Sequence, residues 1–173
     1  DFGVRSDMQL GTYLEKKGSA QCKSSVIFAG LRTTGTSVLK AKKSRNHTEL
    51  MCKYLGLPVS VNSKKNYDLI KVRNAKKIKP FNYKIPSDIS SSAFFIVLAA
   101  LSNNSALLIK GVNINPSRVG IITILKKMGV NIKFKNKKNY KGELIADISV
   151  INTKNLKAIN CPPKLNSGAI DEF

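Results

Sequence analysis

Three consecutive residues, Ser19, Ala20 and Gln21, stand where an apolar helix is predicted to begin. The first turn of a helix has backbone N–H groups without intrahelical partners and a partial positive charge, a combination that suits a phosphate group. The Ser19 hydroxyl and the Gln21 amide could add further hydrogen bonds. Ser19 could equally be an ordinary N-terminal cap, because serine is a preferred capping residue. These residues alone leave both interpretations open.

Two further residues, Ser44 and Arg45, precede a second predicted helix. A guanidinium group at this place could hold a phosphate through two parallel hydrogen bonds, although an arginine among lysines could also be merely solvated. Asp171 stands at the entry of another predicted helix. Its carboxylate could act as a general base, or it could be an acidic residue that the helix dipole favours.

The helices that would position these residues belong to a pattern that occurs twice. Each copy has an apolar helix, at residues 20–31 and 90–101, and then a β-rich run, at residues 36–40 and 106–110. An amphipathic helix with i, i+3, i+4 spacing follows at residues 46–55 and 117–128, and a glycine ends it in both copies. We expect Asn46 and Glu49 to cap the first of these helices, and Asn115 with Pro116 to begin the second.

Two strands close each copy. One follows the glycine, and the other is predicted at residues 68–72 and 146–151. The tetrapeptide Lys-Lys-Asn-Tyr, at residues 64–67 and 137–140, is predicted to form the turn between them. Each copy therefore has the order strand, helix, strand, helix, strand, strand, over about residues 12–79 and 83–158. A third copy should open its first helix from Ser167 onward, so we expect an internal fragment of a longer α/β protein.

The charge of the chain is high, with 30 Lys+Arg against 10 Asp+Glu, which gives +20. Such an excess could indicate nucleic-acid binding. However, the lysines are scattered, arginine is scarce and aromatic residues make up only 7%. Base stacking and bidentate base readout need more of both. The charge therefore predicts affinity for anions in general, including phosphorylated metabolites.

Several other classes are excluded by composition. The three cysteines, Cys22, Cys52 and Cys161, form no Cys-x-x-Cys pair, and His47 has no neighbouring ligand. We expect neither a zinc site nor a disulfide framework. The polar start of the chain is unlike a signal peptide, and no apolar run approaches the roughly 20 residues of a membrane span. A soluble, cytoplasmic protein is expected.

Five short motifs, taken in order, resemble one enzyme family. They are Gly-Ser-Ala-Gln-Cys-Lys-Ser-Ser at 18–25, Ser-Arg-Asn-His-Thr-Glu at 44–49, Ile-Pro-Ser-Asp-Ile-Ser-Ser-Ser-Ala-Phe-Phe at 85–95, Asn-Ile-Asn-Pro-Ser-Arg at 113–118 and Ala-Ile-Asp-Glu-Phe at 169–173. In this order and at these distances the set resembles the EPSP synthases (3-phosphoshikimate 1-carboxyvinyltransferases). The resemblance begins at about Thr12 and covers nearly the whole chain.

The resemblance implies an α/β (α+β) fold of two lobes, each built from three β-α-β-α-β-β units. Residues 1–84 would belong to the lobe that binds shikimate 3-phosphate, and residues 85–173 to the second lobe. Two complete units and the start of a third would be present. The implied reaction moves the enolpyruvyl group of phosphoenolpyruvate to the 5-hydroxyl of shikimate 3-phosphate and releases phosphate, in chorismate and aromatic amino acid biosynthesis. No cofactor, metal, nucleic acid or membrane is implied, and the full-length protein would be a monomer.

The resemblance also assigns roles to individual residues. Those that would bind shikimate 3-phosphate are Ser19, Ala20, Gln21, Ser44, Arg45 and Asp171. Gln21 would also contact phosphoenolpyruvate, and Asp171 would be the catalytic carboxylate. Asp88 is interpreted as a helix cap or hinge residue. Because most of the phosphoenolpyruvate site would lie outside residues 1–173, the fragment alone is expected to be inactive.

Two alternatives stand beside this interpretation. The sister enolpyruvyl transferase that acts on UDP-N-acetylglucosamine would share the fold and the repeat, but the motifs at residues 19–21 and 44–49 argue against it. A basic nucleic-acid-binding module is the second alternative, and it predicts binding that weakens steeply with salt.

Overall fold

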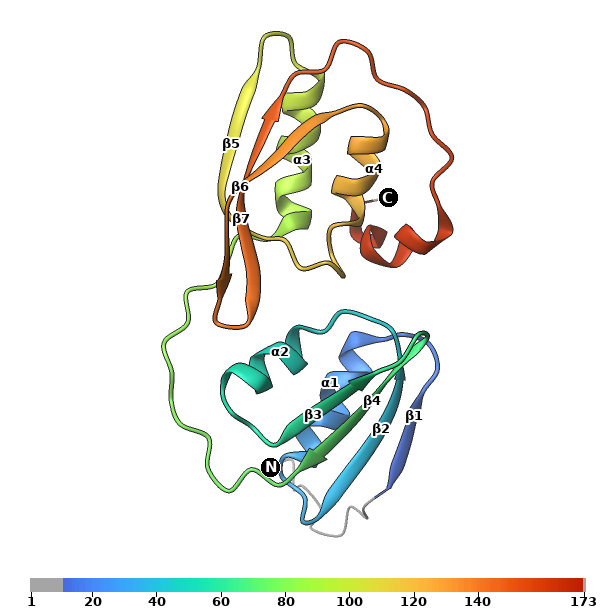
Figure 1. The fold of residues 1–173 in the computed structure, drawn as a ribbon, viewed down its shortest axis with the longest axis vertical. Helices are drawn as coiled ribbons and strands as arrows, with labels where there is room; N and C mark the ends of the chain where they lie inside the picture. The colour runs from blue at the N-terminus through green and yellow to red at the C-terminus, as the bar shows by residue number, and fades with distance from the viewer. Residues whose placement is uncertain (1–10, 173) are drawn as a thin grey trace, which may run out of the picture. The chain divides into compact units, whose positions relative to one another are not determined.

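The structure, a computed structural model, describes residues 11–172 of the chain. It folds as two compact units, unit 1 (Asp1–Phe81) and unit 2 (Asn82–Phe173), and both combine helices with strands (Figure 1). The mixed α/β class predicted from the sequence is therefore confirmed. Within the described residues, no helix has both the length and the apolar character needed to cross a bilayer.

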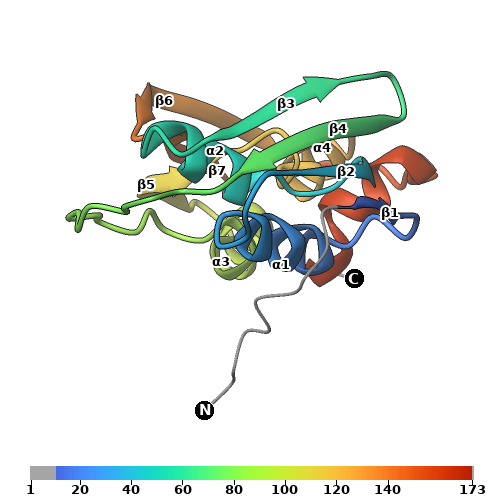
Figure 2. The ribbon, with the colours of Figure 1, turned by 90° about the horizontal axis from the view of Figure 1, so that it is seen from below.

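The described part of unit 1, from residue 11 onward, contains a four-stranded sheet and two helices. Its elements in chain order are β1 (Thr12–Glu15), α1 (Ala20–Gly30), β2 (Thr36–Lys42), α2 (His47–Tyr54), β3 (Val59–Ser63) and β4 (Tyr67–Arg73). The strands lie in the order β1-β2-β4-β3, with β1 parallel to β2 and the other two pairs antiparallel. Figure 2 shows α1 on one side of the strands β2, β4 and β3.

The core of unit 1 follows from alternation along its two central strands. In β2 and β4 every second residue is buried, so that only one face of the sheet is covered. Leu39 lies directly opposite Ile70 on this face, and both are at most 1% exposed. Ile27 of α1 and Cys52 of α2 belong to the same buried cluster. Both helices therefore pack on the same face of the sheet.

Unit 2 has the same succession of helices and long strands. They are α3 (Ile89–Leu101), β5 (Ala106–Asn113), α4 (Gly120–Lys127), β6 (Asn131–Tyr140) and β7 (Glu143–Ile151), followed by the short 3₁₀-helices η1 (Pro163–Gly168) and η2 (Ile170–Glu172). The antiparallel sheet has the order β5-β7-β6. A single parallel bridge joins Ser87 to Val112 of β5, on the side of β5 that β1 occupies beside β2 in unit 1.

One predicted helix cap and one predicted helix start are wrong. Asn46 occupies the N-cap position of α2 as predicted, but its side chain makes no capping hydrogen bond, and Glu49 pairs with Lys23 of α1. The helix predicted from residue 117 begins only at Gly120. The Asn115 side-chain oxygen accepts hydrogen bonds from the backbone N–H and the hydroxyl of Ser117, at 2.9 and 2.8 Å, and these hold the preceding residues in a turn.

Two other predictions fail near the ends of the second copy. The second Lys-Lys-Asn-Tyr lies inside β6, and the turn to β7 is made by Lys141 and Gly142, both with positive φ. The pairing of β6 with β7 continues past a register shift between Lys135 and Lys138 as far as Tyr140 opposite Glu143, so the hairpin extends through the predicted turn. The helix expected from Ser167 is replaced by η1 and η2, two short 3₁₀ turns.

Candidate functional site

The start of α1 has the geometry of a capped helix. Ser19 precedes the helix, and its hydroxyl oxygen accepts a hydrogen bond from the backbone N–H of Cys22 at 3.2 Å. The same hydroxyl lies 3.4 Å from the side-chain oxygen of Gln21, to which it donates. The first turn of α1 contains no acidic residue. Ser19 is thus a cap, and Ala20 and Gln21 form an unopposed, electropositive first turn.

The loop before α1 is held by Glu15, a residue outside the set predicted from the sequence. Its carboxylate accepts hydrogen bonds from the backbone N–H of Lys17 at 2.8 Å and of Gly18 at 2.8 and 2.9 Å. Burial raises the pKa of Glu15, but hydrogen bonds from the backbone of Ser19, Gly18 and Lys17 outweigh this and lower the pKa below its usual value. Glu15 therefore orders the chain just ahead of Ser19.

Gly18 brings the approach to α1 against the approach to α2. Its φ is +81°, and a Cβ atom there would lie 3.3 Å from the backbone oxygen of Lys43. A side chain at this position would be strained by the backbone conformation and crowded by Lys43. Since Lys43 is followed directly by Ser44 and Arg45, the segments before the two helices are neighbours.

Two side-chain contacts then join the first turns of α1 and α2. The ammonium group of Lys23 lies 2.7 Å from Oε1 of Glu49, and the hydroxyls of Ser24 and Thr48 are 2.6 Å apart. The Lys23 side chain is 0% exposed and that of Glu49 is 6% exposed. Although the Lys23–Glu49 distance is short, its angles are not those of a hydrogen bond, and Oε2 of Glu49 is buried with no hydrogen-bond partner among the described residues.

Ser44 supplies an unusual feature at the junction of the two helices. Its hydroxyl oxygen is buried and has no hydrogen-bond partner among residues 11–172. Nearly all buried polar groups in proteins are hydrogen-bonded, so an exception needs an explanation. Ser44 and the half-buried Arg45 directly precede α2, and a ligand oxygen at this junction would satisfy the hydroxyl.

Lys43, which precedes Ser44, is paired with Asp68 of β4. Its ammonium group lies 2.8 Å from Oδ1 of Asp68 and also donates to Ser63. Burial raises the pKa of Asp68, but the hydrogen bonds from Lys43 and Ser63 outweigh it and lower the pKa below its usual value.

The contacts between the starts of α1 and α2 bring five of the predicted site residues to two adjacent helix starts in unit 1. They are Ser19, Ala20, Gln21, Ser44 and Arg45.

The sixth predicted residue, Asp171, lies in η2 of unit 2. Its side chain is 44% exposed, and Oδ2 lies 3.8 Å from Nη2 of Arg118. The same nitrogen donates to Oδ1 of Asp88 at 3.1 Å and to the hydroxyl of Ser90 at 2.6 Å. Arg118 is the last residue of the motif at 113–118, and no role was predicted for it.

Asp88 confirms the capping role predicted for it. It precedes α3, and its Oδ2 accepts a hydrogen bond from the backbone N–H of Ser91 at 2.8 Å. Burial raises the pKa of Asp88, but the hydrogen bonds from Ser91 and the charge of Arg118 outweigh this and lower it. Asp88 therefore remains a negative partner for Arg118.

The segment that carries Asp171 is held by a close approach of two backbones. A Cβ atom on Gly120, at the start of α4, would lie 2.6 Å from the carbonyl carbon of Gly168, at the end of η1. Only glycine permits this contact at Gly120. The packing of η1 on α4 thus keeps η2 next to the turn that contains Arg118.

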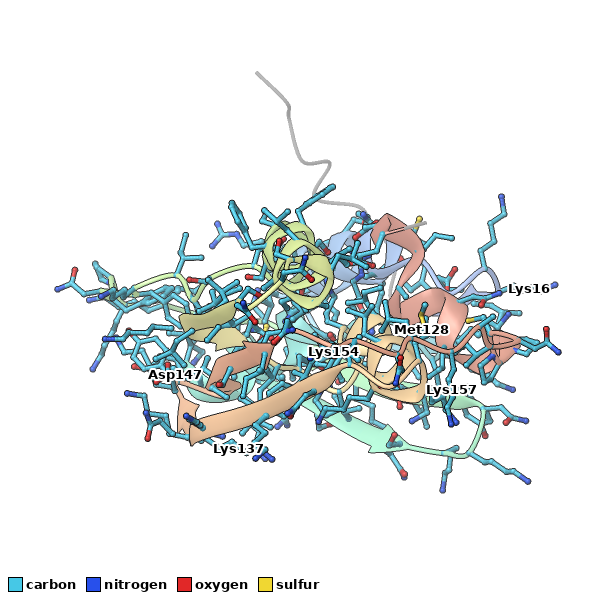
Figure 3. All side chains as sticks on the ribbon, turned by 90° about the horizontal axis from the view of Figure 1, so that it is seen from above. Lys16, Met128, Lys137, Asp147, Lys154 and Lys157 are labelled. Atoms are coloured by element: carbon cyan, nitrogen blue, oxygen red, sulfur yellow. The ribbon has the colours of Figure 1, made fainter. Side chains whose placement is uncertain are left out.

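Unit 2 also has a pocket of about 580 Å³ that contains none of the predicted site residues. It is lined by Lys84, Ile85, Pro86, Ser87, Lys110, Gly111, Asn136, Lys138, Tyr140, Ile145, Ala146 and Asp147. Asp147 accepts hydrogen bonds from the Gly111 backbone and the Asn136 amide, both at 2.8 Å. These bonds, the Asn136 one most strongly, lower the pKa of Asp147. Figure 3 labels Asp147 on β7 and Lys137 on the neighbouring β6.

Comparison with known proteins assigns the chain to a family. The model of the family EPSP synthase (3-phosphoshikimate 1-carboxyvinyltransferase) matches residues 8–164. The chain belongs to the EPSP synthase family. It is 43% identical over 156 residues to the 3-phosphoshikimate 1-carboxyvinyltransferase of Ruthia magnifica, and 41% identical over 172 residues to that of Hydrogenovibrio crunogenus.

A solved structure of the family is also similar. The EPSP synthase from Acinetobacter baumannii superposes with a TM-score of 0.84 at 37% identity, over 95% of this chain. The two relatives above match over 90% and 97% of this chain. The chain spans 35% and 38% of the length of those relatives and 37% of the solved structure. Family members therefore contain about two further chain lengths of sequence beyond the matched region.

Proposed function

We propose that this protein is a transferase that moves the enolpyruvyl group of phosphoenolpyruvate to the 5-hydroxyl of shikimate 3-phosphate, giving EPSP and phosphate. Membership of the EPSP synthase family supports the reaction class. The observation that carries the substrate assignment is the buried, unpaired hydroxyl of Ser44 at two adjacent helix starts. Two helix N-termini, a guanidinium group and a hydroxyl in need of a partner suit a phosphate monoester.

Each residue of unit 1 has a role in this proposal. Backbone N–H groups at Ala20 and Gln21 and the hydroxyl of Ser44 bind phosphate oxygens, and Arg45 balances the charge. Ser19 caps α1 and so keeps the first turn in place. The Gln21 amide, which both donates and accepts, also contacts phosphoenolpyruvate.

Asp171 of unit 2 takes the proton of the attacking hydroxyl. As that proton moves to the carboxylate, the hydroxyl oxygen bonds to C2 of phosphoenolpyruvate while C3 gains a proton from a general acid or water, which gives a tetrahedral intermediate. Loss of phosphate from C2 and of one proton from C3 then restores the double bond of the enolpyruvyl product. A carboxylate that is 44% exposed is accessible to such a substrate. The reaction needs no metal or organic cofactor in this proposal.

The repeat in the sequence and the two compact units support a repeated organisation. We propose that the two units are copies of one β-α-β-α-β-β unit in separate lobes, with a boundary near residues 84 and 85. The sheet orders are β1-β2-β4-β3 in unit 1 and β5-β7-β6 in unit 2. They match when the Ser87 bridge is taken as the counterpart of β1, so that β5, β7 and β6 correspond to β2, β4 and β3. The two compact units divide between residues 81 and 82. The protein acts in the cytoplasm as a monomer on small molecules, without nucleic acid or membrane partners.

A coupled phosphate-release assay on the full-length protein tests the proposal. With both substrates, phosphate should appear at a rate that depends on shikimate 3-phosphate and saturates with it. UDP-N-acetylglucosamine in its place should give no turnover above background. Turnover with UDP-N-acetylglucosamine alone would favour the sister transferase, and no turnover with either acceptor would refute the proposed function.

A further inference from the structure

The guanidinium group of Arg118 joins three separate segments of unit 2. A single nitrogen, Nη2, lies 3.1 Å from Asp88, 2.6 Å from Ser90 and 3.8 Å from Asp171. The first two residues begin α3, and the third lies in η2. Arg118 itself stands in the turn before α4.

The exposures of these side chains differ in an informative way. Arg118 is only 14% exposed, whereas Asp88 and Asp171 are 51% and 44% exposed. The cation is therefore fixed within the protein, and the carboxylates face outward. The 3.8 Å separation between Arg118 and Asp171 is that of an ion pair, and the Asp171 carboxylate is also exposed toward a substrate.

The charges around Asp171 show why this cation matters. Asp88 and Asp171 contact the same nitrogen at 3.1 and 3.8 Å, so these contacts place the two carboxylates within about 7 Å of each other, and Glu172 follows directly. Without the guanidinium group, the acidic residues would repel each other. Asp171 would then move outward from the start of α3.

We propose that Arg118 is a positioning residue, which holds the Asp171 carboxylate in the orientation that accepts the proton of the attacking hydroxyl. The proposal rests on the proposed function, because it assumes that Asp171 is the base. Asp88 and Ser90 fix the guanidinium group through the rigid start of α3, and the contact of Gly120 with Gly168 fixes η2. A misplacement of about 1 Å at a reacting group can cost on the order of 10²-fold in rate.

The test measures kcat and the KM for shikimate 3-phosphate in the full-length protein. Arg118→Met should lower kcat by about 10²-fold and change this KM by less than about fivefold. Arg118→Lys keeps the charge but loses the planar guanidinium group, so its kcat should lie between that of the wild type and that of Arg118→Met. Ser90→Ala removes one anchor of the guanidinium group and should lower kcat by a smaller factor. Lys127→Met, an exposed lysine on α4, is the matched control and should leave kcat unchanged.

A double-mutant cycle with Asp171→Asn separates positioning from a purely structural role. If Arg118 acts through Asp171, then Arg118→Met should cost no more than about threefold once Asp171 is already replaced. Equal losses in both backgrounds, or an unchanged kcat in Arg118→Met, would overturn the inference. Circular dichroism and thermal unfolding of each variant show whether it is folded. A loss of kcat that follows a loss of folded protein also overturns the inference.

The same experiment keeps the two proposals apart. If the wild-type protein shows no turnover that depends on shikimate 3-phosphate, the proposed function fails. If the wild type turns over but Asp171→Asn retains its kcat within about threefold, the reaction stands, and both the role of Asp171 and that of Arg118 are overturned.

Discussion

The buried pair of Lys23 and Glu49 gives the sharpest prediction for stability. The two charges are 2.7 Å apart with side chains 0% and 6% exposed, and they join the first turn of α1 to the first turn of α2. At an effective dielectric constant of about 20, two unit charges at this distance attract by about 6 kcal/mol. Desolvation of both ions opposes this attraction, and the incomplete hydrogen bonding of Glu49 leaves the opposing cost large.

The perturbation is the pair of single substitutions Lys23→Met and Glu49→Gln, and the double substitution Lys23→Met/Glu49→Met. Lys23→Met leaves the charge of Glu49 buried without a counter-ion, and Glu49→Gln does the same to Lys23. Removing one partner of a buried ion pair typically destabilises a protein by about 3–5 kcal/mol. That loss corresponds to a factor of about 10² to several 10³ in the unfolding equilibrium. The double change removes both charges and fills the space with apolar side chains, so it should cost less than either single change.

The assay is urea unfolding of the full-length protein, followed by circular dichroism and by hydrogen exchange of the α1 amides. Lys53→Met, on the exposed side of α2, is the matched control and should change the free energy of unfolding by less than about 0.5 kcal/mol. The reasoning is refuted if Glu49→Gln costs less than about 1 kcal/mol. It is also refuted if the loss in free energy of unfolding of the double variant equals the sum of the losses of the two single variants, because additive losses indicate charges that are not coupled.

Two other predictions concern the loop before α1 and the acid sensitivity of β4. Gly18→Ala should destabilise the protein by about 1–2 kcal/mol and raise the KM for shikimate 3-phosphate, because Gly18 has a positive φ and lies against the backbone of Lys43. Gly56 is the control, because its φ is also positive, at +65°, but it has open space around it. Gly56→Ala should therefore cost similar stability without changing that KM. An unchanged KM in Gly18→Ala would contradict the predicted junction. The pKa of Asp68 is lower in the folded state than in the unfolded state, where it is about 3.9. Its ionised carboxylate therefore stabilises the fold above that unfolded value, and this stabilisation is lost as the pH falls through the folded pKa. Asp68→Asn should therefore flatten the fall of the melting temperature below about pH 4, and an unchanged slope would show that Asp68 contributes nothing there.

Much of the fold was predictable because it depends on local periodicity. The alternation in β2 and β4 and the apolar stretches of α1 and α3 identify these elements without any long-range information. The first strand of the second copy was harder, because it is reduced to the bridge at Ser87. Pro86, which precedes this residue, has no N–H group to donate to a strand.

The side-chain pairs at the two sites could not be predicted in the same way. Lys23 looks like an ordinary helix lysine until α2 is placed beside α1, and only then does its contact with Glu49 become apparent. Arg118 meets Asp88 and Asp171 only because a turn, a helix cap and a 3₁₀ segment come together in unit 2. The available signal was the position of Arg118 at the end of the Asn-Ile-Asn-Pro-Ser-Arg motif.

The most direct test of a phosphate site at the starts of α1 and α2 is a comparison of two ligands by calorimetric titration. Arg45→Met should raise the Kd for shikimate 3-phosphate by about 10- to 100-fold, since hydrogen bonds to charged groups contribute about 1.5–3 kcal/mol. The Kd for shikimate, which lacks the phosphate, should change less than twofold, and Lys53→Met should affect neither ligand. An unchanged Kd for shikimate 3-phosphate, or an equal loss for both ligands, would contradict a phosphate site at this junction.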